Sequence, residues 1–202
     1  MAFDTYSSLQ TEIIRWAWRD AGDTDFANSV PGFVALAHNR INRQLRVREM
    51  EARATPTLAA GVATLPSDYL EYRKVSFGGC PLSACEPAWG EEQYGSEAGT
   101  PAFFSITGGS IRVWPQGNGT LTLDYFQAVP SLGISTPTNW LLTAHPELYL
   151  YGALIEAATF MMDDGRLTTW GNLYDQAMQA VMKDGERAKY ANIAARVSGP
   201  TP

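Results

Sequence analysis

A run of arginines between residues 38 and 53, HNRINRQLRVREMEAR, is the part of this sequence best suited to an interaction role. Arg40, Arg43 and Arg46 follow one another at a spacing of three, which places them along one face of a helix. A guanidinium group stays charged and donates in a fixed fork that matches a carboxylate. The chemistry that this stripe predicts is therefore ion pairing.

Three interpretations of the arginines are open. In the first, they form a solvated helix face that pairs with Glu49 and Glu51 of the same chain. In the second, they bind carboxylates of a neighbouring subunit, because arginine is favoured in ionic interfaces. Contact with DNA ranks third. The residues that the second interpretation assigns to the contact between subunits are Arg40, Arg43, Arg46 and Arg48.

The sequence predicts no enzyme active site. Its two histidines, His38 and His145, have no partner in a recognisable motif, and local hydrogen bonding or capping explains both. There is no G-x-S-x-G nucleophile motif. The Gly pairs at 78–79 and 108–109 lack the Lys-Ser or Lys-Thr of a phosphate-binding loop, so hairpin turns explain them better. We expect no cofactor.

Metal binding is not expected either. The adjacent carboxylates at 91–92 and 163–164 lie beside turns, and neighbours in sequence generally point apart, whereas hard cations need several convergent oxygens. Cys80 and Cys85 lie in one short loop, CPLSAC. Two thiols alone do not make a zinc site, and a cytosolic origin makes free thiols the expected state, with a disulfide as the alternative.

Apolar residues at three- and four-residue spacing predict four helices, two at each end of the chain. Ser29 is the expected cap of the second helix, with Pro31 just inside it. Pro146 and Glu147 suit the first turn of the third, where a missing N–H and a negative charge are both favourable. Residues 163–165 interrupt the pattern. The expected helices span residues 4–21, 29–49, 146–162 and 167–187.

Between these pairs the periodicity changes to short runs separated by turn residues, which predicts β structure. The clearest hairpin turns at Gly108 and Gly109, and Pro87 and Gly95 bound a single helical turn. The order in which the strands pair cannot be predicted. The expected strands span residues 54–58, 62–65, 69–77, 81–83, 102–107, 110–114 and 120–128.

The predicted fold class is α+β: a four-helix bundle made of two helical hairpins, with an inserted antiparallel β meander or sandwich-like region and an extended C-terminal tail. The tail carries too little apolar surface to pack alone and is expected to become ordered on a partner. The expected divisions are a first hairpin at 1–52, the β-rich insertion at 53–130, a connector and second hairpin at 131–190, and the tail at 191–202.

The chain has 202 residues, a net charge of −6 and a pI near 4.9. This charge argues against broad nonspecific attachment to nucleic acid, which depends on a surplus of Lys and Arg. There is no apolar run of the length, about 18 residues, that a membrane span requires. The first residues, MAFDTYSSLQ, do not resemble a signal peptide. We therefore expect a protein made in the cytoplasm, with no membrane partner.

Five blocks of the chain, taken in order, point to one family. They read RINRQLRVREMEA, ATLPSDYLEYRKV, TPAFFSITGGSIRVWPQ, LTLDYFQAVP and TNWLLTAHPELYLYGALIEAA. This order resembles that of the head-to-tail adaptor proteins of short-tailed bacteriophages, also called connector or head-completion proteins. The similarity runs from about Tyr6 to Arg187, and NWLLTAHPELYLYGAL is its most specific part. The loop from Cys80 to Cys85, with Trp89, departs from the family pattern.

The resemblance implies a structural virion protein at the head-to-tail interface, with no catalytic residue. Such adaptors form a ring, a homo-oligomer of about twelve subunits, beneath the portal protein, and the tail nozzle protein attaches to it. Double-stranded DNA passes through the lumen of the ring during genome ejection without sequence-specific binding. The C-terminal region reaches the portal, which assigns portal docking to Lys189, Tyr190, Ile193, Arg196 and Val197.

Two other functions are compatible with the sequence. A carbohydrate-binding β module on a helical stalk, as in tail-associated binding proteins, would use Trp89, Tyr94 and Trp114 to stack on sugars. A small hydrolase would need His38 or His145 beside a carboxylate in a cleft.

Overall fold

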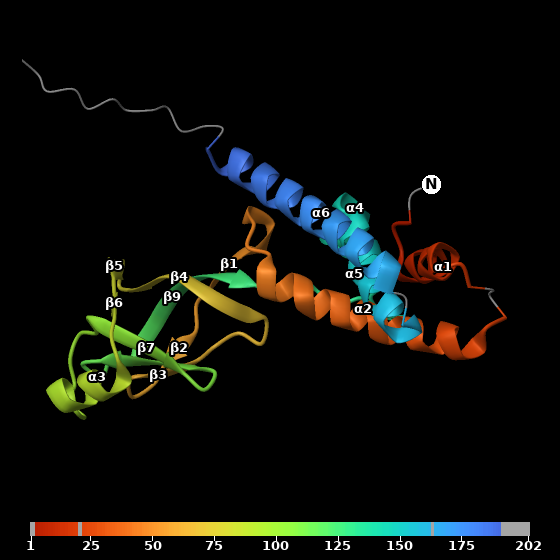
Figure 1. Cartoon of the computed structure of the whole chain (residues 1–202). Coiled ribbons are helices and arrows are strands. Elements are labelled where there is room, and N and C mark those ends of the chain that lie inside the picture. Colours follow the sequence, from red (N-terminus) through yellow and green to blue (C-terminus); the bar gives the residue numbers. More distant parts are fainter. Residues whose placement is uncertain (1–2, 20–21, 163, 191–202) are drawn as a thin grey trace, which may run out of the picture. The chain divides into compact units, whose positions relative to one another are not determined.

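The computed structural model describes residues 3–19, 22–162 and 164–190, with the side chains of 164 and 186–190 left out (Figure 1). Contacts between residues divide the chain into two compact units. The helical unit comprises the described parts of Met1–Glu49 and Val129–Pro202, and the β unit comprises Met50–Ala128. This mixture of helices with two sheets confirms the predicted α+β class.

One central helix organises the helical unit. Helix α5, Pro146–Met161, packs against the other four helices of the unit, and its buried residues lie on all of its sides. A helix that is apolar all round is stable only at the centre of a packed structure. Gly152 allows the close approach, since a Cβ there would lie 3.0 Å from Cβ of Ala37. The four surrounding helices are α1 Tyr6–Trp16, α2 Thr24–Gln44, α4 Trp140–Ala144 and α6 Asp164–Tyr190.

Helix α2 begins five residues earlier than its predicted cap at Ser29. Its N-cap is Asp23, whose carboxylate accepts the N–H of Phe26 at 3.1 Å. Ser29 instead donates back to the Asp25 carbonyl within the helix, and Pro31 also lies inside it. The missing N–H of a proline removes only one helical hydrogen bond. Burial of Phe26 and the rest of the apolar face outweighs that loss.

The ends of the other helices follow local signals more closely. Pro146 and Glu147 lie in the first turn of α5, as predicted. Met162 ends α5 in the left-handed conformation, with φ 55°. Helix α6 starts at Asp164, so the interruption predicted at 163–165 is shorter than expected and Gly165 is helical. Helix α1 is shorter than predicted, with a capping box at Thr5. The short helix α4 was not predicted.

The β unit contains two sheets. Strand β9 is central to the first, whose order is β1-β9-β4-β5, and β2 also pairs with β9. The second has the order β3-β8-β7-β6. Helix α3, Pro87–Tyr94, runs between the proline and glycine predicted to bound it. The strands are β1 Glu51–Ala54, β2 Thr57–Leu58, β3 Val62–Thr64, β4 Tyr69–Phe77, β5 Cys80–Pro81, β6 Ser83–Ala84, β7 Phe103–Thr107, β8 Ser110–Trp114 and β9 Gly119–Gln127.

The two sheets share one apolar core, as in a sandwich. Leu121 and Leu123 of β9 belong to the same buried cluster as Ile111 and Val113 of β8. The region is not a simple meander, because its strand order is not the sequence order and β6 pairs with β7 in parallel. The predicted hairpin turn does join β7 and β8, with positive φ at both of its glycines.

Candidate functional site

A groove of about 530 Å³ lies between α2 and α6 in the helical unit. Two of the predicted arginines line its α2 side, and residues spaced by three and four line its α6 side. Ile155 of the central helix contributes apolar surface. The lining residues are Arg40, Arg43, Gln44, Ile155, Leu167, Gly171, Tyr174 and Asp175.

Arg40 is bound within its own chain. Its guanidinium forms an ion pair with Glu156 of α5 and lies over the ring of Tyr174, 5.9 Å from the ring centroid. The Tyr174 hydroxyl donates to Gln44 at 3.0 Å, and burial raises the pKa of Tyr174 to about 12. Tyr174 is thus a neutral, fixed part of the groove wall, and the charge of Arg40 stabilises the packing of α2 on α5.

Arg43 is available to a partner. It is exposed, and its side chain forms no hydrogen bond or ion pair with any residue that the structure describes. The Asp175 side chain is likewise exposed and has no such partner within the described part of the chain. A Cβ added at Gly171 would meet no atom within 4 Å, so the α6 wall is open there. The groove therefore offers one cation, one anion and accessible apolar surface, a combination suited to a protein segment.

The other two predicted arginines lie near the end of α2. Arg46 donates to the carbonyls of Asn42 and Leu45 at 2.8 and 2.6 Å, so it caps the helix. Arg48 is exposed in the 3-10 turn Arg48–Met50. The stripe that the spacing predicts is thus divided by its contacts: Arg40 and Arg46 hold the fold, whereas Arg43 and Arg48 face solvent.

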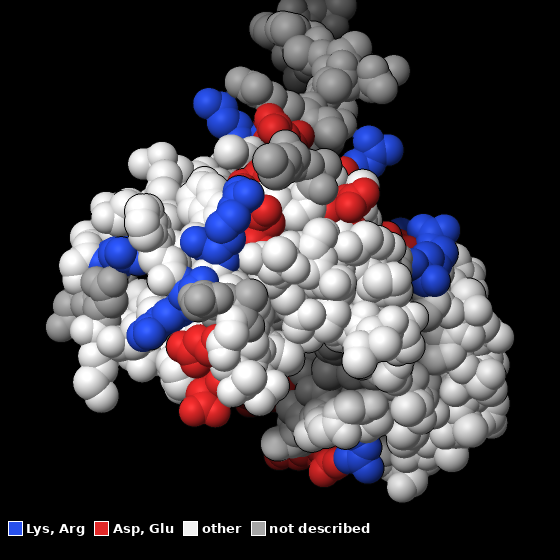
Figure 2. Space-filling view, turned by 90° about the vertical axis from the view of Figure 1, so that its right-hand side faces the viewer, with Lys and Arg blue, Asp and Glu red and all other residues white. Residues whose placement is uncertain are grey.

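Charges of both signs are interspersed on one face of the molecule. In the face shown in Figure 2, Lys and Arg side chains lie close to Asp and Glu, and uncharged residues cover most of the area. A patch of this kind does not provide the continuous positive surface that neutralises a row of phosphates. On this face, the arrangement favours contacts with protein over strong attachment to DNA.

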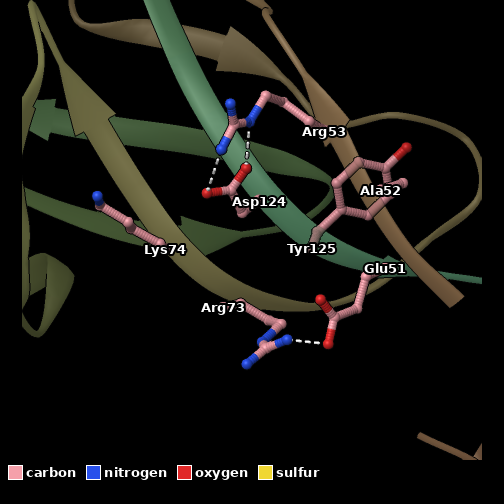
Figure 3. Close-up of a pocket in the computed structure, with 7 residues that line it drawn as sticks. All are labelled: Glu51, Ala52, Arg53, Arg73, Lys74, Asp124 and Tyr125. Atoms are coloured by element: carbon pink, nitrogen blue, oxygen red, sulfur yellow. Dashed lines mark hydrogen bonds and ion pairs between the residues drawn. The ribbon is translucent and has the colours of Figure 1, made fainter. Parts of the chain in front are cut away.

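A second charged pocket, of about 460 Å³, lies in the β unit where β1, β9 and β4 are neighbours (Figure 3). Register places Arg53, Asp124 and Lys74 side by side across the three strands. Arg53 donates to both carboxylate oxygens of Asp124, at 2.6 and 3.2 Å, and this contact lowers the pKa of Asp124. The ammonium group of Lys74 points away from this pair.

An irregularity in β4 adds a further cation to this pocket. The register shifts between Tyr72 and Lys74, so Arg73 has no directly opposite residue on β9. Arg73 pairs with Glu51 of β1 and lies over the ring of Phe126 at 5.3 Å. No sequence signal identified this pocket, because it depends on the pairing of β9 with both β1 and β4.

His38 belongs to a polar network in the helical unit. Its Nε2 accepts from the Asn42 amide at 2.9 Å, because the amide oxygen of Asn42 already accepts the N–H of Val129. His38 Nδ1 therefore carries the proton and faces the Tyr149 hydroxyl at 3.0 Å. Asn139 donates to the same hydroxyl at 2.9 Å. Hydrogen bonding within the fold thus explains this histidine without a catalytic role.

The network predicts that stability depends on the protonation of His38. Burial lowers the pKa of His38 below 6.5, so the unfolded chain binds the proton more readily. The stabilisation is complete above about pH 6.5 and decreases as the pH falls from there to the lowered pKa, by at most about 1.4 kcal/mol per pH unit. Urea unfolding between about pH 5.5 and 8 should show this slope. His145→Gln should retain the slope and His38→Gln should lose it; equal slopes in all three proteins would contradict the prediction.

The other residues considered for chemistry are accounted for by local structure. His145 lies at the junction of α4 and α5, 3.5 Å from Glu147 in the same turn. Cys80 and Cys85 are free thiols. Among the described residues there is no group of three or more His, Cys, Asp or Glu side chains that could hold a metal ion. None of the helices, over the same residues, has the length and apolar character to cross a membrane.

The aromatic residues proposed to stack on sugars are not equivalent. Trp114 is buried, with 3% of its surface exposed, so it cannot contact a ligand. Trp89 is 41% exposed and packs edge-on against Tyr94. The carbohydrate-binding interpretation therefore loses one of its three aromatic residues.

The predicted portal-docking residues lie at or beyond the end of α6. Lys189 and Tyr190 are the last residues of that helix. Ile193, Arg196 and Val197 lie outside the described residues. The assignment of these five residues to portal docking stays a prediction.

A comparison with family models assigns the chain to a family. The model described as SU10 adaptor protein matches residues 4–198, nearly the whole chain. A search of curated proteins finds no match. The family match confirms the resemblance to phage head-to-tail adaptors that the sequence blocks carry. The chain belongs to the SU10 adaptor protein family.

Proposed function

We propose that the protein forms the ring-shaped head-to-tail adaptor that lies between the portal and the tail nozzle of a phage virion. The observation that carries this proposal is the family match across nearly the whole chain. In this function about twelve copies surround the DNA channel and lengthen it, and the outer surface provides the platform to which the tail attaches.

The groove between α2 and α6 supports the lateral contact that such a ring requires. Each subunit of a ring meets its two neighbours through different surfaces, so a groove on one copy must accept a different part of the next. Arg43 and Asp175 provide two charges of opposite sign, neither paired with a described residue of its own chain. Pairing across a subunit boundary would fix the register of the neighbour more than it would add affinity.

The charge of the chain supports a passive role toward DNA. At −6 per copy, a ring of about twelve subunits would be strongly acidic and would not retain DNA by counterion release. We assign portal docking to the C-terminal region, Lys189 to Val197, and attachment of the nozzle to other surfaces of the ring.

The test is the mass of the full chain, measured by light scattering in line with size exclusion, alone and after mixing with its cognate portal. We expect a portal-dependent complex that contains about twelve copies. If the protein elutes unbound at every concentration, the adaptor function is wrong.

Reversal of one charge tests the lateral contact in the same experiment. Arg43→Glu should lower the number of copies bound per portal at least about threefold, since a like-charge contact is unfavourable. Lys183→Glu makes the same change in net charge at an exposed position of α6 outside the groove, and it should assemble normally. If the two variants assembled equally, the groove would not be part of the contact between subunits.

A further inference from the structure

A pocket beside α3 in the β unit is separate from the groove between α2 and α6. It has a volume of about 410 Å³. Trp89 and Phe103 contribute aromatic rings, and Glu86 contributes a carboxylate. The other lining residues are Ala84 and Cys85.

The packing of α3 on the second sheet explains why this pocket exists. Helix α3 lies against β7 and β8, and Gly90 faces the buried ring of Trp114. A Cβ at Gly90 would lie 2.6 Å from the indole of Trp114, so only glycine allows the helix to lie this close to the sheet. This contact leaves Trp89, the residue before Gly90, at the surface.

Trp89 is more exposed than a packing role requires. Its ring meets Phe103 edge-on at 5.0 Å and Tyr94 edge-on at 6.2 Å, yet 41% of its surface remains accessible. Two rings thus fix the orientation of the indole while part of it stays open to the pocket. A rigid, partly exposed tryptophan is the residue type that most often anchors a binding partner.

The surroundings of this tryptophan are acidic. Glu91 is paired with Arg112. By contrast, Glu86, which lines the pocket, and Glu92, three residues after Trp89 on α3, are exposed and form no ion pair with any described residue. Their charges add to a negative potential around the exposed ring. An apolar partner covering this region would bury carboxylates without a counter-charge, which is unfavourable.

We propose that the pocket binds an arginine side chain of a partner protein. A guanidinium group stacks on the face of tryptophan, and its N–H groups pair with a carboxylate in a fixed fork. The pocket provides both components, the Trp89 ring and the Glu86 carboxylate. The inference deepens the proposed function, on which it rests for the presence of a protein partner, by naming the chemistry of that partner.

The test uses the full chain, labelled for detection of indole N–H signals, and two small probes. The probes are Nα-acetyl-arginine amide and Nα-acetyl-citrulline amide, which have nearly the same shape but differ in charge. The signal that is lost in Trp89→Ala identifies Trp89. Arginine should shift this signal in a saturable manner, with an affinity about fivefold to tenfold higher than that of citrulline.

Variants locate the binding site. Glu86→Gln should weaken arginine binding about fivefold, whereas Glu49→Gln, at an exposed position of the other unit, should leave it unchanged. Each protein's unfolding midpoint verifies that it is folded.

Three results would overturn the proposal. They are no shift of the Trp89 signal up to the solubility limit of the arginine probe, an equal shift with citrulline, and an equal shift with methyl glucoside, which would point to a sugar site. The titration with arginine contains no portal, so a negative result there would not change the outcome of the mass measurement. Conversely, a protein that fails to bind the portal could still bind the arginine probe.

Discussion

Asn139→Ala should destabilise the helical unit by about 2–4 kcal/mol, the largest effect that we expect from a single substitution. Asn139 is 7% exposed and lies between the connector after the β unit and helix α4. Its Oδ1 accepts the N–H of Leu142 at 2.7 Å, and its Nδ2 donates to the Pro130 carbonyl at 2.7 Å and to the Tyr149 hydroxyl at 2.9 Å. Alanine would leave all three partners without this side chain.

Urea unfolding followed by tryptophan fluorescence measures this loss. Asn139→Ser should give an intermediate value, because serine can cap α4 but cannot donate to both other partners. The matched control is Asn172→Ala, at an exposed position of α6. This substitution should change the free energy of unfolding by no more than about 0.5 kcal/mol. If the two alanine variants had equal stabilities, the polar network would not be a main source of stability.

Gly90→Ala should destabilise the β unit by about 1–3 kcal/mol. The added methyl group would lie 2.6–2.8 Å from three atoms of the Trp114 indole, which is 3% exposed and cannot rotate away without a change in the core. Because alanine favours a helix over glycine by about 1 kcal/mol, a net loss would show that the contact with Trp114 outweighs helix propensity.

The same substitution at Gly171 provides the control. Gly171 lies within α6, and a Cβ there would meet no atom within 4 Å. Gly171→Ala should therefore stabilise the protein by about 0.5–1 kcal/mol. Opposite signs for the two variants are the expected result in thermal and urea unfolding. Stabilisation by both would mean that α3 can move away from the sheet at little cost.

The Gly90 contact also links stability to the proposed arginine site. Trp114 is buried against Gly90 of α3, whereas Trp89, the neighbour of Gly90 in the sequence, remains exposed. A substitution that lifts α3 should therefore weaken binding of the arginine probe as well as lower stability. Glu86→Gln separates these effects, since it removes a charge without changing the contact between α3 and the sheet.

Local chemistry explains which features the sequence alone determined. Pro146 with Glu147 specifies the start of α5, Gly108 with Gly109 specifies a hairpin turn, and the alternation of apolar with polar residues at 120–128 specifies the strand β9. Each of these signals acts within a few residues, through dihedral preferences, capping or side-chain periodicity. The family resemblance likewise lay in the linear order of sequence blocks and could be recognised without a structure.

Contacts between distant segments decided the rest. The spacing of the arginines predicted the same ion-pairing role for Arg40 and Arg43. The packing of α5 and α6 then pairs Arg40 with Glu156 and leaves Arg43 exposed. From the sequence, Trp89 and Trp114 were both candidates for stacking on a sugar. The position of α3 on the sheet buries Trp114 and leaves Trp89 exposed. Such differences depend on which partners the chain brings together over more than a hundred residues, and no local preference encodes that choice.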